Sequence, residues 1–410
     1  MILSVIASAF NYFAYPILSR ILPTHEYGDI TVALSLFTQI GTFLSSLTAI
    51  SIGLAKSHSD KDGGEVASLQ NTLVQVFAAI SILFLTTAPF LMPLISVPIT
   101  YALPIVIMLL VSIPITIITG YLNGKQHLVK VGIATCLVAA IQIITAIAVS
   151  IATRSGLATM FAMGLVQIIS LLLLLWLYRA DNLPRLDKTL FALQPLSRKA
   201  QVLLRFTLFS SLAVMSINLL QLVDLTLVRQ HGTGPDVVFY TDTYVISRAL
   251  FFAGMIFIWP FLSDLSLTSK QTNTHLFLRL IAVITGLVIA ASIGIALFGN
   301  QIFHVLFGRV SVNLTTSPIV YLSVIYKALI LVVTAVTLYL VVMRRYKTMF
   351  LAAVSCILVI GGGALLPHSS VLGVVLNLTI LAAASAAFSL IIFFTDKPPN
   401  PSTNTSHKRV

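Results

Sequence analysis

The chain has 410 residues, of which 58% are apolar and only 9% are charged, so it lacks the polar surface of a soluble globule. This composition excludes a soluble enzyme, a disordered protein and a secreted disulfide scaffold, and it indicates an all-α polytopic membrane protein. The net charge of +12 raises the question of where the basic residues lie. They are scattered between apolar runs rather than gathered in one domain, so they do not indicate a nucleic-acid partner.

Twelve apolar segments are each long enough to form a membrane-spanning helix. They cover residues 1–19, 28–55, 69–92, 99–121, 128–151, 155–178, 201–228, 238–264, 275–298, 317–342, 347–366 and 370–394. The longest connection, 179–200, is rich in charge and divides the chain into six-helix bundles at 1–178 and 201–394. The polar, Pro-rich tail at 395–410 is predicted to be disordered.

The distribution of lysine and arginine between alternate connections predicts the orientation in the membrane. One side holds 18 of these residues and the other holds four, namely Arg20, Arg154, Arg229 and Arg309. The imbalance predicts that both termini and the connection at 179–200 are cytoplasmic. The two remaining cations, Arg248 and Lys327, lie inside predicted spans.

The two halves of the sequence resemble each other in layout. Asn11, Arg20 and the pair Tyr27-Gly28 in the first half are matched by Asn218, Arg229 and the pair Phe239-Tyr240 in the second half. Six helices per half would preserve orientation, so the pattern predicts a parallel repeat about an axis normal to the membrane. Chance similarity between amphipathic helices is the alternative.

Polar side chains follow one face of the first two predicted helices in each half. They include Asn11 and Gln39 in the first half and Asn218 and Gln221 in the second. A polar stripe in hydrocarbon must face protein or water, so these residues either bond helix to helix or line a shared cavity. Because the stripes recur at equivalent positions in both halves, we favour the cavity.

Arg248 and Lys327 each lie about 10 residues from the outer end of a predicted span, roughly 15 Å deep in a core of ~30 Å. A cation at that depth costs at least ~2.5 kcal/mol, so a partner or a use is expected. One possibility is a structural ion pair between Arg248 and Asp224, the acid found in the core of these spans; this would leave one cation without an acid. The other is a cationic cavity for an anionic substrate. The candidate cavity residues are Arg248, Lys327, Asp224, Asn11, Asn218, Gln221, Gln39 and Arg20.

No metal-ligand cluster, phosphate-binding loop or nucleophile motif occurs in the sequence, so neither a metal nor a cofactor is predicted. An enzyme such as a membrane polysaccharide polymerase usually needs a large loop that carries catalytic groups. The outer connections of this chain are short, and we therefore predict that it is not an enzyme.

The segment Arg20-Ile21-Leu22-Pro23-Thr24-His25-Glu26-Tyr27-Gly28 resembles the first helix connection of polysaccharide biosynthesis and O-antigen flippases. These belong to the multidrug/oligosaccharidyl-lipid/polysaccharide (MOP) exporter superfamily. The resemblance implies a MATE-like, V-shaped pair of six-helix bundles in the bacterial inner membrane. It also implies alternating access and transport of an undecaprenyl-diphosphate-linked oligosaccharide, with Arg248 and Lys327 as candidates to engage its anionic groups.

The resemblance leaves some properties open. Partnership with other polysaccharide assembly proteins and coupling to H⁺ or Na⁺ are not decided by it. Relatives usually begin with a basic extension, whereas no lysine or arginine precedes Arg20 here, so completeness of the first helix is also open. A cation-coupled multidrug exporter is the alternative function, and it is disfavoured because such exporters usually need acids in the cavity.

Overall fold

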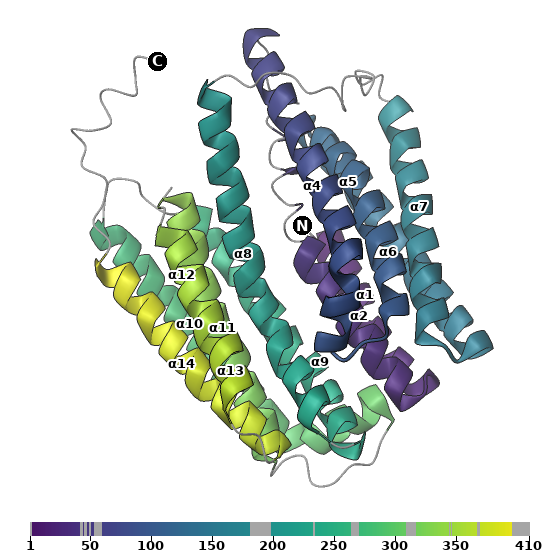
Figure 1. Cartoon of the computed structure of the whole chain (residues 1–410), viewed down its shortest axis with the longest axis vertical. Coiled ribbons are helices and arrows are strands. Elements are labelled where there is room, and N and C mark those ends of the chain that lie inside the picture. The colour runs from purple at the N-terminus through teal and green to yellow at the C-terminus, as the bar shows by residue number, and fades with distance from the viewer. Residues whose placement is uncertain are drawn as a thin grey trace. The chain divides into compact units, whose positions relative to one another are not determined.

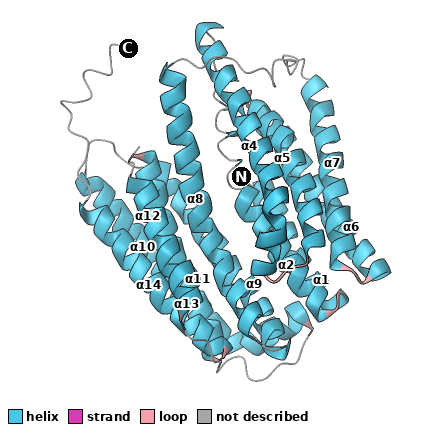
Figure 2. Ribbon diagram, in the orientation of Figure 1, coloured by secondary structure: helices cyan, strands magenta, loops and turns pink. Residues whose placement is uncertain are grey.

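The computed structural model describes residues 2–41, 44, 47, 48, 51, 52, 60–180, 198–232, 234–263, 270–308, 317–343, 345, 347–366 and 370–395. Within these residues the regular structure is helical and contains no strand, as Figure 2 shows. The chain divides into two compact units, Met1–Met215 (unit 1) and Ser216–Val410 (unit 2). The boundary falls inside one long helix.

The helices follow the predicted segments in chain order (Figure 1). Unit 1 contains α1 (Ile2–Ile21), α2 (Thr24–Gly41), α4 (Asp60–Leu94), the 3₁₀ turn η2 (Ile99–Tyr101), α5 (Ala102–Gly124), α6 (Leu128–Thr153) and α7 (Gly156–Ala180). The helix α8 (Arg198–His231) continues from unit 1 into unit 2. Unit 2 also contains α9 (Gly234–Ser263), α10 (Lys270–Phe307), α11 (Pro318–Val342), α12 (Lys347–Cys356), the π-helical η5 (Ile357–Gly361), α13 (Gly362–Leu365) and α14 (Val371–Thr395).

Each of the twelve predicted segments overlaps one of these helical stretches, with α12, η5 and α13 together forming the eleventh. The predicted connection at 179–200 is helical at both ends, and its residues 181–197 lie outside the described part of the chain, as does the tail from 396 onward. The division into bundles at 1–178 and 201–394 stays a prediction.

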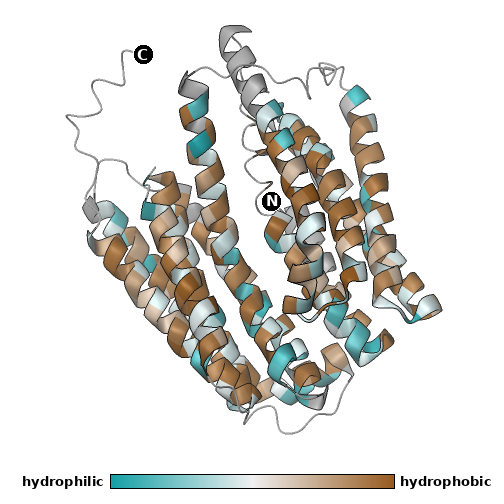
Figure 3. Ribbon diagram, viewed as in Figure 1, coloured by the Kyte–Doolittle hydropathy of each residue, from teal (hydrophilic) through white to brown (hydrophobic). Residues whose placement is uncertain are grey.

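Ten of the described helical stretches are long and apolar enough to cross a membrane, and they correspond to the third to twelfth predicted segments. Brown, which marks hydrophobic residues, predominates along these helices in Figure 3. Leu172 and Trp176 of α7, for example, are well exposed, as expected for a helix that faces lipid. The chain is therefore a multi-pass membrane protein. The first two predicted spans are helices in the structure, and their membrane crossing stays a prediction.

Three chain connections of unit 1 meet at Glu26, the acidic residue of the motif between α1 and α2. Glu26 Oε2 accepts hydrogen bonds from the Tyr101 hydroxyl at 3.0 Å and from the Gly156 N–H at 2.7 Å. Gly156 begins α7, so the carboxylate lies at a helix N-terminus, where negative charge is favoured. Arg154, which ends α6 in the left-handed conformation, donates to the carbonyl of Ile21 at 2.5 Å. The motif thus holds one end of unit 1 together.

We expect Glu26→Ala to lower the free energy of unfolding by about 1–3 kcal/mol, because it leaves the buried hydroxyl of Tyr101 without its acceptor. Glu26→Gln should lose less, since an amide oxygen still accepts hydrogen bonds. The thermal midpoint of the purified protein in detergent measures both effects. If Glu26→Ala melts with the wild-type protein, the carboxylate does not hold this end of unit 1.

In unit 2, protein surrounds α11 on several sides. It packs against α9, α10 and α14, and more than half of its length is buried within the protein. Aromatic rings pack together near the C-terminal end of α11. The ring centroid of Phe393 lies 4.0 Å from that of Phe277 and 4.7 Å from that of Tyr339. A polar side chain on the buried face of α11 must therefore find its partners in the protein.

Candidate functional site

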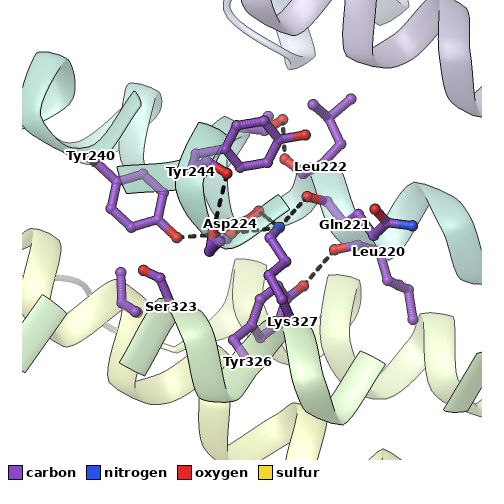
Figure 4. A network of polar contacts seen from close by, with 12 residues as sticks. Leu220, Gln221, Leu222, Asp224, Tyr240, Tyr244, Ser323, Tyr326 and Lys327 are labelled. Atoms are coloured by element: carbon purple, nitrogen blue, oxygen red, sulfur yellow. Dashed lines mark hydrogen bonds and ion pairs between the residues drawn. The ribbon is translucent and has the colours of Figure 1, made fainter. Parts of the chain in front are cut away.

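Three helices of unit 2 bring polar and aromatic residues together in one largely buried cluster, and Figure 4 shows the part of it around Asp224 and Lys327. The members share helical spacing: Asn218, Gln221 and Asp224 follow at steps of three on α8, and Tyr326 and Lys327 are adjacent on α11. On α9 the spacing is four residues throughout. The α9 members are Tyr240, Tyr244, Arg248 and Phe252. We call these nine residues the charged cluster.

The centre of the charged cluster is an ion pair between Asp224 and Lys327. The ammonium of Lys327 lies 2.9 Å from Asp224 Oδ1 and 2.8 Å from Oδ2, so it contacts both carboxylate oxygens. The Tyr240 hydroxyl donates to Oδ2 at 2.8 Å. Lys327 and Asp224 are 0% and 1% exposed, so the pair is removed from solvent and its charges must compensate each other.

Two adjacent residues of α11, Tyr326 and Lys327, also bind the backbone of α8. Lys327 Nζ donates to the carbonyl of Gln221 at 2.5 Å, and the Tyr326 hydroxyl donates to the carbonyl of Leu220 at 2.5 Å. A carbonyl has two lone pairs, so each can accept this bond besides its helical one. Consecutive donors on one helix thus meet consecutive acceptors on another, which fixes the register of α11 against α8.

Arg248 is the second buried cation of the cluster. It is 3% exposed, and its guanidinium carbon lies 5.9 Å from the ring centroid of Tyr244 and 5.3 Å from that of Phe252. Lys327 Nζ lies 4.5 Å from the same Tyr244 ring. Both cations therefore contact one electron-rich ring, an arrangement that attracts positive charge.

The ion pair corrects the interpretation of the sequence in one respect. The structural alternative joined Asp224 to Arg248, which stand on neighbouring helices, whereas the structure joins Asp224 to Lys327. Lys327 is fully engaged with protein groups, so its role in the structure is to neutralise Asp224.

A second buried acid was not predicted from the sequence. Asp242 of α9 is 3% exposed, although Asp224 was expected to be the acid of the core. Asp29 of α2 is buried as well, and each aspartate stands two residues after a fully buried tyrosine, Tyr27 or Tyr240. Both halves thus have the spacing Tyr-x-Asp at the start of their second helix, which matches Tyr27 with Tyr240 and shifts the predicted alignment of Tyr27 with Phe239 by one residue. This shared spacing was visible in the sequence.

The remaining candidates divide between the two units. Asn218 and Gln221 are both buried, and Gln221 Nε2 donates to Asn218 Oδ1 at 3.1 Å, so they form the polar end of the cluster on α8. In unit 1, Gln39 of α2 is buried and Arg20 at the end of α1 is exposed. Asn11 lies in α1, but its side chain is outside the described residues. The structure thus brings five of the eight candidates together, all in unit 2: Asn218, Gln221, Asp224, Arg248 and Lys327.

Comparison with known proteins identifies solved structures with the same fold. No family model matches the sequence, and no curated protein matches it. Among solved structures, a multidrug resistance MATE family transporter of the MOP superfamily in its inward-facing conformation matches with a TM-score of 0.69 and 13% identity. The match covers 95% of this chain and 94% of that chain.

Two further structures agree with it. The outward-facing conformation described in the same terms has a TM-score of 0.63 at 14% identity and covers 96% of this chain and 92% of its own. A MATE structure in the bent conformation has a TM-score of 0.65 at 13% identity, with coverage of 95% and 92%. The predicted MATE-like helical architecture is confirmed: the chain has the fold of these transporters over nearly its whole length.

Proposed function

We propose that the chain is a membrane transporter that moves an anionic, lipid-linked oligosaccharide across the bacterial inner membrane by alternating access. The observation that carries the proposal is Arg248, a cation buried in a predicted span of a chain with a transporter fold. Ionisable residues inside membrane spans are rare because they are costly, and they mark substrate and ion pathways. The resemblance of the segment from Arg20 to Gly28 to polysaccharide flippases supports the glycan substrate.

The surroundings of Arg248 favour an anion that offers oxygens in a plane. A guanidinium carries its five N–H donors in one plane, an arrangement that matches paired carboxylate or phosphate oxygens. Tyr244 and Phe252 lie one helical turn to either side of Arg248 on α9. A diphosphate accepts hydrogen bonds from such a fork in a bidentate manner, which makes a prenyl diphosphate a suitable ligand.

The test uses purified protein in liposomes that contain a fluorescent, prenyl-diphosphate-linked oligosaccharide. We expect the labelled lipid to move between leaflets faster than in protein-free liposomes, as measured by quenching with a membrane-impermeant reagent. A lipid with the same glycan and no phosphate should move about tenfold more slowly or worse, because it lacks the charge-assisted hydrogen bonds. Equal rates with and without protein would contradict the proposal.

A cation-coupled multidrug exporter is the second candidate. It is favoured by the solved structures with the same fold, which are described as multidrug resistance transporters. The buried acids Asp224 and Asp242 would be its candidate cation-binding groups. The same liposomes, loaded with a cationic dye and given a pH or Na⁺ gradient, distinguish the two. Dye transport that follows the gradient, together with no movement of the glycan lipid, would favour the exporter.

A further inference from the structure

The ammonium of Lys327 has the environment of a bound monovalent cation. Its three N–H groups meet three oxygens, the two of the Asp224 carboxylate and the carbonyl of Gln221. Two ring faces complete the surroundings, with centroids 4.5 Å away at Tyr244 and 5.0 Å away at Tyr326. Carboxylate oxygens, a main-chain carbonyl and aromatic faces are the groups that bind alkali and small ammonium ions in proteins.

Because this ammonium is part of the Lys327 side chain, it cannot diffuse away from the site as a free ion would. Lys327 stands on α11, and its neighbour Tyr326 is bonded to the carbonyl of Leu220, so the stem of the lysine starts from a fixed position. An incoming ion could reach Asp224 only if the ammonium left it. The side chain of Lys327 is fully buried, and a buried ammonium without its counter-charge is strongly unfavourable.

We propose that Lys327 is a resident cation: its ammonium occupies the position at Asp224 that a free monovalent cation would otherwise take. Ion exchange at Asp224 is then not a step of the transport cycle. This inference deepens the proposed function and rests on it in one respect, namely that the protein has a transport cycle. It addresses the coupling ion that the sequence left open.

The proposal makes the site testable without any substrate. Lys327→Ala removes the ammonium and leaves a space beside Asp224 and the carbonyl of Gln221. Purified wild-type and variant proteins are melted in detergent with chloride salts of Na⁺, Li⁺, methylammonium or N-methylglucamine, at constant ionic strength. N-methylglucamine serves as the cation that is too large for the site.

We expect Lys327→Ala to melt well below the wild-type protein in N-methylglucamine, and to gain roughly 5 °C when Na⁺, Li⁺ or methylammonium is supplied. The wild-type midpoint should not depend on the cation. Lys327→Ala combined with Asp224→Asn should lose the response, because the variant has no carboxylate to bind the ion. Lys130→Ala, which removes an exposed lysine of α6, is the matched control and should behave as wild type.

Should Lys327→Ala fail to fold, Lys327→Gln replaces it, since its amide still donates to Asp224 and leaves the negative charge to be balanced. The same midpoint for either variant in all four salts would overturn the proposal, as would a wild-type midpoint that rises with Na⁺ to the same degree. Neither measurement uses a transported molecule. A failure of the glycan transport assay therefore contradicts the proposed function alone, and leaves the resident cation to be decided by the melting data.

Discussion

Asp224→Leu is expected to lower the free energy of unfolding by about 3–5 kcal/mol, because it leaves the ammonium of Lys327 buried with no counter-charge. The lysine is fully buried, so it cannot regain hydration without opening the contact between α8 and α11. The Tyr240 hydroxyl also loses its acceptor. Thermal midpoints of the purified protein and its abundance in membranes measure the loss.

The matched control removes both charges at once. Asp224→Leu with Lys327→Met fills similar volumes with apolar groups, and such replacements of buried ion pairs are often neutral or stabilising. We therefore expect the double variant to recover most of the loss, and adding Tyr240→Phe should recover more. A double variant as unstable as Asp224→Leu alone would show that the pair does not account for the effect.

Much of the fold was predictable because each helix is a long apolar run with a polar boundary. The predicted segments differ from the observed helices mainly at their ends, and one of these differences affected the predicted site. The eighth segment was expected to begin at residue 238, whereas α9 begins at Gly234, so Asp242 lies two turns inside a helix rather than near its entrance. An acid was therefore left out of the predicted core.

The partners within the candidate site were less predictable than its members. Helical spacing identified Asn218 and Gln221, which share one face of their helix, and depth within a predicted span identified Arg248. The pairing of Asp224 with Lys327 spans 103 residues and depends on how α8 and α11 pack, which no local pattern contains. The ion pair considered from the sequence joined Asp224 to Arg248 instead.

The role of Glu26 shows the same limit. Its motif carries the family resemblance, but the sequence does not show that its carboxylate meets α7 some 130 residues later. A short motif can reveal kinship through residues that stabilise a connection, whereas contact with a substrate depends on groups that no motif identifies. Arg248 is such a group, and its role has to be tested directly.

Arg248→Gln is expected to reduce the initial rate of glycan-lipid movement in liposomes by roughly tenfold to hundredfold, because the substrate loses one or more charge-assisted hydrogen bonds. Glutamine keeps a planar polar end that still contacts the rings of Tyr244 and Phe252, so we expect the membrane abundance to stay near wild type. Rates are normalised to the amount of folded protein in each liposome preparation.

Arg248→Lys separates charge from geometry at the same position. Lysine keeps the positive charge and loses the planar fork, so it should transport better than Arg248→Gln and less well than wild type. Lys130→Gln on α6 provides the control for loss of an exposed charge. If Arg248→Gln moves the glycan lipid at the wild-type rate, Arg248 does not bind the anion, and the proposed substrate loses its main support. If Arg248→Lys equals wild type while Arg248→Gln is inactive, the site binds a charge without recognising the planar arrangement of a diphosphate.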